Sequence, residues 1–106
     1  MRDLILRFVH EQPGATFVEL CREIPGFSGK FKSTAGDYPN IVLWENVSAE
    51  AIDVLTQLEA DGKIRFKPTV PLTYMADGEI LRLPIAKGLK EYKSPHWLPV
   101  VLNIAT

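Results

Sequence analysis

The clearest hydrophobic pattern lies in the middle of the chain. Ala51, Leu55 and Leu58 are spaced at i, i+4 and i+7, the period of one helical face. Ser48 is a favourable N-cap residue, and Gly62 is a residue type that ends many helices in the left-handed conformation. The pattern predicts a helix that begins after the Ser48 cap and ends at Gly62. One face of this helix is expected to be buried.

The residues that follow alternate with a period of two. Ile64 and Phe66 fall on one side of a strand, and Lys63, Arg65 and Lys67 fall on the other. This alternation predicts a strand with three cations on its exposed side. An alternative is that the lysines only protect an edge strand against aggregation, which explains the same residues.

Beyond this strand the chain contains signals for further strands. After two prolines that suit a turn or a strand edge, residues 72–75 are expected to return antiparallel. Asp77-Gly78 is a strong hairpin signal and leads into an apolar run at 80–85. Arg82, in that run, would join the exposed cations if it lay on the same face.

The N-terminal part predicts two short helices. Apolar pairs four residues apart predict a helix over 3–12, which a Pro-Gly pair closes. Thr16 and Glu19 match a capping box for a second helix, which ends at another Pro-Gly pair. Cys21 falls on the apolar face of this helix, where a small buried thiol is expected rather than a reactive one.

Residues 25–39 form the longest stretch without periodicity, with three glycines and two prolines in fifteen residues. We predict a loop here, followed by a short buried strand at 40–44. The loop interleaves aromatic rings with cations, a composition that stacks on bases and contacts phosphates. Alternatively the rings pack inward and the lysines are solvated. The residues concerned are Phe27, Lys30, Phe31, Lys32 and Tyr38.

A capped helix that runs directly into a strand resembles the passage from the third helix into the wing of a winged-helix domain. The resemblance covers residues 3–85. It implies an α+β winged helix with three helices, an elaborated antiparallel wing of about three strands and a strand-like C-terminal tail. The common winged-helix order has a small first strand between the first two helices, so the strand expected at 40–44 departs from it.

Composition fits one domain. The 106 residues, 46% hydrophobic, suffice for a single core, and we expect one domain over 1–106, with a core at 3–85 and an extension at 86–106. No run approaches the about 18 apolar residues of a membrane span, and charges interrupt the N-terminal apolar stretch, unlike a signal peptide. A lone Cys21 agrees with a reducing compartment. We therefore expect a cytoplasmic protein with no membrane partner.

Charge is distributed unevenly along the chain. The net charge is −1, but residues 1–61 carry five Lys/Arg against ten Asp/Glu, and residues 62–106 carry seven against three. This division favours a polarised surface whose basic side suits a polyanion, or else a mixed, merely solubilising surface. The predicted central helix turns Glu50, Asp53 and Asp61 to solvent, a face that a DNA duplex would repel.

Catalytic chemistry has little support in the sequence. His10 and His96 are isolated, no Cys or His pair has metal-ligand spacing, and no nucleophile lies in a recognisable motif. We expect a non-enzymatic binding protein without metal or cofactor.

Two functional hypotheses remain. The resemblance implies a small DNA-binding or transcription-regulating module that contacts the phosphates of duplex DNA through its wing and the 25–39 loop. The cations concerned are Lys30, Lys32, Lys63, Arg65, Lys67 and Arg82. The alternative is a protein-interaction module whose acidic third helix meets a basic protein partner. The apolar C-terminal tail would either pack within the chain, which a small core favours, or form a homodimer.

Overall fold

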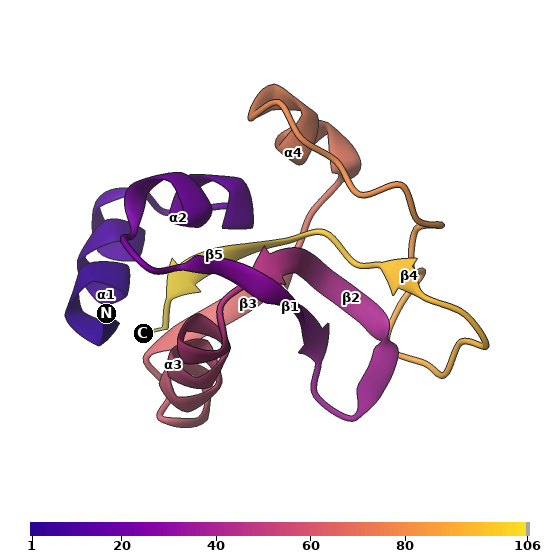
Figure 1. Cartoon of the computed structure of the whole chain (residues 1–106), viewed down its shortest axis with the longest axis horizontal. Coiled ribbons are helices and arrows are strands. Elements are labelled where there is room, and N and C mark those ends of the chain that lie inside the picture. Colours follow the sequence, from indigo (N-terminus) through magenta and orange to yellow (C-terminus); the bar gives the residue numbers. More distant parts are fainter. Residues whose placement is uncertain (106) are drawn as a thin grey trace.

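The computed structural model describes residues 1–105 as an α+β domain (Figure 1). The strands form a three-stranded sheet in the order β1-β2-β4 and a two-stranded sheet of β3 and β5. In chain order the elements are α1 (Arg2–Glu11), α2 (Phe17–Glu23), β1 (Ser28–Ala35), β2 (Tyr38–Val47), α3 (Ala49–Ala60), β3 (Ile64–Pro68), α4 (Pro71–Ala76), β4 (His96–Trp97) and β5 (Val100–Ile104).

The two N-terminal helices are confirmed. The Thr16 hydroxyl accepts a hydrogen bond from the Glu19 backbone N–H at 3.2 Å, and the Glu19 carboxylate accepts one from the Thr16 N–H at 3.0 Å. This is the capping box expected at the start of α2. The Thr16 hydroxyl also donates to the Asp77 carboxylate at 2.6 Å, so the start of α2 is tied to the residue that follows α4.

Helix α3 is also confirmed, with its ends where the pattern placed them. The Ser48 hydroxyl accepts from the Ala51 N–H at 3.1 Å and donates to the Gly26 carbonyl at 2.7 Å. Gly62 adopts a φ of +70°, and the Lys63 N–H donates back to the Leu58 carbonyl at 2.8 Å. These two features form a Schellman-type end. The apolar stripe is buried, and the expected acidic residues are exposed on the other side.

The loop predicted at 25–39 is wrong, because β1 and β2 form an antiparallel hairpin there (Figure 1). Ala35 pairs with Tyr38 across a two-residue turn, and Gly36 in that turn has a φ of +52°, which glycine adopts without strain. The register shifts repeatedly along the hairpin, so apolar residues do not recur at every second position. The strand predicted at 40–44 is confirmed as the buried part of β2.

The three-stranded wing is also wrong. Residues 72–75 lie in helix α4, which begins with Pro71 at its first turn, where the fixed φ of proline favours a helix. Gly78, with a φ of +93°, donates its N–H to Met75 and ends the helix, so the Asp-Gly pair is not a hairpin turn. Residues 80–85 form no strand beyond an isolated bridge between Ile85 and Trp97.

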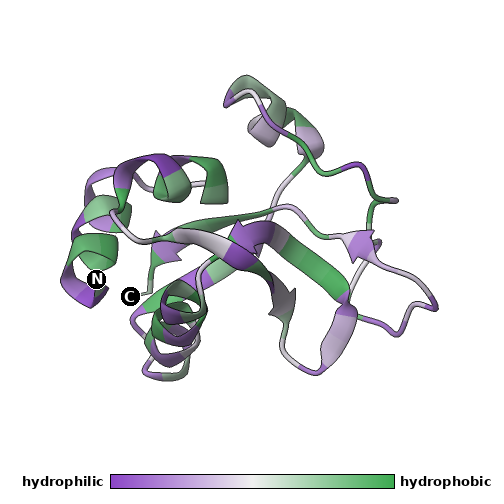
Figure 2. Ribbon diagram, viewed as in Figure 1, coloured by the Kyte–Doolittle hydropathy of each residue, from purple (hydrophilic) through white to green (hydrophobic). Residues whose placement is uncertain are grey.

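The C-terminal tail pairs with β3 in place of the strand predicted at 72–75. Strand β5 pairs antiparallel with β3, and its Leu102 also exchanges backbone hydrogen bonds with Ala15 at 3.1 and 2.8 Å. The tail therefore packs within the chain. Figure 2 shows hydrophobic residues along β2 and β5, which cross the middle of the molecule, and hydrophilic ones on much of α1 and α3. Trp97, Val100 and Leu102 are part of the core.

An aromatic cluster joins α4 to the sheets. The Tyr74 ring lies 5.0 Å from that of Trp44 and 5.2 Å from that of Trp97, between ring centroids. The Tyr74 hydroxyl donates to the Val100 carbonyl at 2.6 Å and accepts from the Phe17 N–H at 3.2 Å. Tyr74 has no exposed surface, so both bonds are made away from water.

Gly29 is required where the hairpin crosses the start of α3. A Cβ at this position would lie 2.4 Å from the Cα of Ser48, a backbone contact that no rotamer relieves. We expect Gly29→Ala to lower the free energy of unfolding by about 1–3 kcal/mol, as overpacking does. Lys30→Ala, next to it on the exposed side of β1, should change it by less than about 0.5 kcal/mol. Urea denaturation followed by tryptophan fluorescence checks both values, and equal stabilities would contradict this packing.

Tyr74 should make the stability of the protein depend on alkaline pH. Burial raises the pKa of Tyr74 well above its ordinary value of about 10, because the phenolate is disfavoured away from water. The stability contributed by the neutral phenol is fully present below pH about 10 and is lost as the pH rises further. At pH 7 we expect Tyr74→Phe to cost about 1–3 kcal/mol, because the Phe17 N–H and the Val100 carbonyl lose their partner.

The difference between wild type and Tyr74→Phe should then shrink above pH 10, since only the wild type has this phenol to ionise. Tyr38→Phe is the matched control, because the Tyr38 hydroxyl forms no hydrogen bond within residues 1–105. Denaturation curves at pH 7 and above pH 10 provide the measurement. A difference that stays constant with pH would show that Tyr74 does not carry the alkaline loss.

Candidate functional site

The cations predicted on the strand after α3 form one exposed row. Lys63 precedes β3, and Arg65 and Lys67 lie within it; all three are exposed. Between them Ile64 is buried, and the ring of Phe66 stacks on that of Phe17, with centroids 6.3 Å apart. Side chains two residues apart on a strand are spaced by about 6.6 Å. The row therefore follows the outer side of β3 at regular intervals.

No carboxylate on β5 neutralises this row. Arg65 lies opposite Asn103, and Lys67 lies opposite Val101, and none of the five β5 residues paired with β3 is acidic. Within residues 1–105 the one ion pair joins Arg2 to Asp61 at 3.2 Å, so the row has no ion-pair partner there. Three positive charges thus remain available to an anionic ligand.

The other predicted site residues lie elsewhere. Lys30 and Lys32 are exposed on β1, which belongs to the three-stranded sheet. Arg82 is exposed on the segment after α4, which Figure 1 places on the side of the molecule away from α1 and α3. The six cations therefore occupy three separate segments, and only those of β3 and the residue before it form a row.

The aromatic residues of the 25–39 segment divide between core and surface. Phe27 is fully buried, with its ring centroid 6.1 Å from that of Phe17, whereas Phe31 is 57% exposed. Tyr38 is partly exposed and lies at the start of β2. Packing therefore accounts for Phe27, as expected from the alternative in which the aromatic rings of this segment pack inward. It does not account for Phe31.

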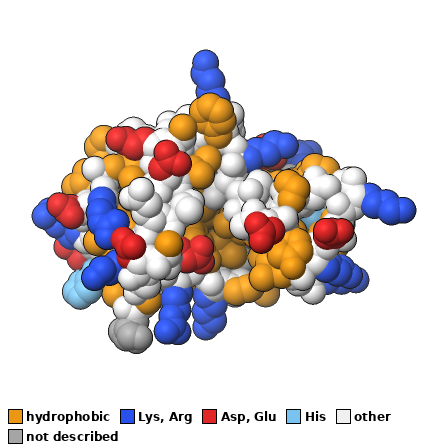
Figure 3. All heavy atoms as spheres, turned by 90° about the horizontal axis from the view of Figure 1, so that it is seen from below, with side chains coloured by type: hydrophobic (Ala, Val, Ile, Leu, Met, Phe, Trp, Pro, Cys, Tyr) orange, Lys and Arg blue, Asp and Glu red, His pale blue; other side chains and the backbone are white. Residues whose placement is uncertain are grey.

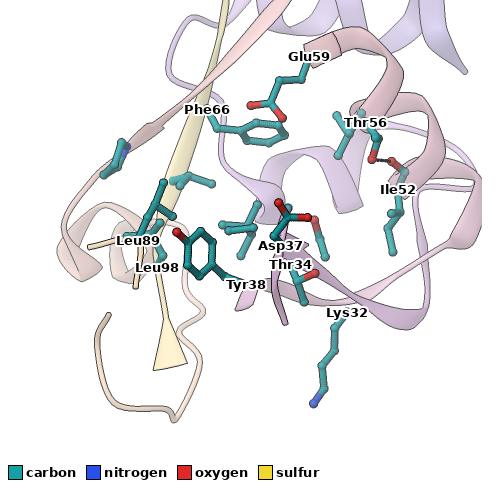
Figure 4. Close-up of a pocket in the computed structure, with 17 residues that line it drawn as sticks. Lys32, Thr34, Asp37, Tyr38, Ile52, Thr56, Glu59, Phe66, Leu89 and Leu98 are labelled. Carbon is teal, nitrogen blue, oxygen red and sulfur yellow. Dashed lines mark hydrogen bonds between the residues drawn. The ribbon is translucent and has the colours of Figure 1, made fainter. Parts of the chain in front are cut away.

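A groove that sequence patterns did not reveal lies between the β1–β2 hairpin, α3 and the β3–β5 pair (Figure 4). Its volume is about 580 Å³. Figure 3 shows hydrophobic side chains in a hollow on this side of the molecule, with acidic side chains beside it and many cations near the outline. Apolar side chains supply most of the lining, among them Leu43, Ile52, Leu55, Phe66, Leu98 and Val100.

Two carboxylates stand at this groove, those of Asp37 and Glu59. Neither forms an ion pair or a hydrogen bond within residues 1–105. The hydroxyl of Thr56 is already used, since it donates to the Ile52 carbonyl at 2.8 Å. Figure 4 shows the Glu59 carboxylate beside the Phe66 ring and the Lys32 side chain pointing away from the cavity.

The isolated histidines and the cysteine form no reactive constellation. Among residues 1–105 no group of three or more His, Cys, Asp or Glu side chains lies close enough to hold a metal ion. Burial raises the pKa of the half-buried Cys21 thiol, and the hydrogen bond with Ser28 only partly opposes this, so the thiol is protonated at neutral pH. No helix within the same residues is both long and apolar enough to cross a membrane.

No family model, curated protein or solved structure matches the chain. Its function is therefore inferred from its own geometry.

Proposed function

We propose that the chain is a winged-helix module that binds DNA through the phosphate backbone. The chain order supports the winged-helix assignment. The Ala15 bridge lies between α1 and α2, where winged-helix domains have their small first strand, and it pairs with β5. Helix α3 then leads into β3, which pairs with the other edge of β5. On this assignment the β1–β2 hairpin is an insertion between the second and third helices.

The observation that carries the DNA proposal is the row of cations along β3. Lys63, Arg65 and Lys67 are exposed, regularly spaced and unopposed by acidic residues on β5. Their spacing of about 6.6 Å is close to the about 6.8 Å that two base steps span along the axis of a DNA strand. A row of this kind can contact every second phosphate of one strand, and each contact releases condensed counterions.

Helix α3 sets the manner of binding. Its exposed side carries Glu50 and Asp53, which would be repelled from the floor of a phosphate-lined groove. We propose that α3 stays outside the duplex and that β3 makes the contacts. Binding through phosphates alone positions a protein without reading bases, so sequence discrimination should be weak. Lys30, Lys32 and Arg82 would add to the long-range attraction without joining the row.

The acidic side of α3 also supports a second candidate function. Glu50 and Asp53 are exposed and form no ion pair within residues 1–105, whereas Asp61 is paired with Arg2. A protein-interaction module would present these carboxylates to a basic partner. A protein-interaction module of this kind needs no contact through β3. Reversing the charges on β3 therefore distinguishes the two candidate functions.

Duplex binding should depend on salt through about three phosphate contacts. For a labelled mixed-sequence duplex followed by fluorescence anisotropy, we expect a log–log slope of affinity against salt near −2.7, at about −0.9 per contact. Lys63→Glu with Arg65→Glu should abolish binding, because the row would then repel phosphates. Glu50→Ala should not weaken binding.

The matched control is Lys87→Glu with Lys93→Glu, which makes the same change in net charge on exposed residues of the segment after α4. Its binding should stay close to that of the wild type. An equal loss in both double variants would mean that net charge alone attracts DNA. Absence of binding at low salt would leave the protein-interaction module as the better proposal.

A further inference from the structure

We infer that the groove between the hairpin, α3 and the β3–β5 pair binds a lipophilic organic cation, a small molecule with an apolar body and one positive charge. The inference is independent of the proposed DNA contacts, because β3 alternates its side chains. Phe66 lines the groove, whereas Arg65 and Lys67 lie on the other side of the strand.

The size and lining of the groove suit a small molecule. Its volume of about 580 Å³ lies within the about 300–1,000 Å³ that ligand sites commonly span. Leu43 and Leu55 form part of its lining and are 6% and 2% exposed, so the surrounding core holds them in place. An apolar body placed here would remove further hydrocarbon surface from water.

The polar groups that face the groove select the sign of the ligand charge. Asp37 lies in the hairpin turn and Glu59 on α3, so the two carboxylates come from different elements. Neither has a cationic partner within residues 1–105. Lys32 also belongs to the lining, but Figure 4 shows its side chain directed away from the cavity. An anion would therefore be repelled, and a cation would gain partners that the protein does not supply.

Two aromatic rings add to the preference for a cation. Figure 4 shows the Phe66 ring beside Glu59, and the Tyr38 ring between Asp37 and Leu98. Phe66 is held by its stacking on Phe17, with an interplanar angle of 10°. The face of an aromatic ring attracts organic cations through its quadrupole. Rings and carboxylates thus line the same groove as the apolar side chains.

Tetraphenylphosphonium and tetraphenylborate test the inference, because they share one shape and carry opposite charges. By isothermal titration calorimetry we expect the phosphonium to bind at a single site, with an affinity at least about ten-fold above that of the borate. Asp37→Asn with Glu59→Gln should weaken phosphonium binding about ten-fold and reduce the difference between the two ions. Ile52→Trp, which fills the groove from α3, should block both ions.

The matched control is Glu50→Gln with Asp53→Asn, which removes two carboxylates from the other side of α3 and should leave phosphonium binding unchanged. Lys67→Glu, which changes the cationic row but lies outside the lining of the groove, should also leave it unchanged, so failure of this inference is distinct from failure of the DNA proposal. Equal binding of the two ions, or binding insensitive to Asp37 and Glu59, would overturn the inference. A basic peptide that displaced the phosphonium while the phosphonium itself bound only weakly would assign the groove to a protein partner instead.

Discussion

The pairing of β5 with its two neighbours is the constraint on which the rest of the structure depends. Leu102 exchanges backbone hydrogen bonds with Ala15 on one side and lies in register with Phe66 of β3 on the other. The strand therefore joins the N-terminal helices to α3 and β3, although it comes from the last residues of the chain. Without it, β3 would have no strand partner for its backbone hydrogen bonds. The cationic row would lose the strand that supports it, and the groove would lose Val100 from its lining.

The aromatic cluster fixes α4 relative to this strand. Tyr74 makes its two buried hydrogen bonds to Phe17, at the start of α2, and to Val100, at the start of β5. Trp97 donates from its indole nitrogen to the Leu43 carbonyl at 3.2 Å, which links β4 to β2. These directed bonds fix the orientation of residues that apolar packing alone would leave less specified. They also connect α4 to the strands that line the groove.

Local patterns predicted the elements that are defined locally. Helix α3 carries its period, cap and terminal glycine within its own sequence, and β3 carries a clean alternation, so both, and the row of cations, could be predicted. The β1–β2 hairpin could not, because its register shifts remove the alternation. Helix α4 could not either, since Pro71 and Asp77-Gly78 suit strands as well as helices, and the deciding contact of Tyr74 is with a residue 26 positions away. The groove could not be predicted either, because one of its walls is the unpredicted hairpin, which lies against α3 and the β3–β5 pair.

Strand β3 separates two surfaces of opposite chemistry. On one side, Arg65 and Lys67 are exposed with no acidic neighbour across the pair. On the other, Phe66 faces a groove with the carboxylates of Asp37 and Glu59. Because side chains alternate along a strand, neighbouring residues of β3 can belong to different surfaces. The small net charge of −1 therefore includes a row of exposed cations and a separate pair of carboxylates at a groove.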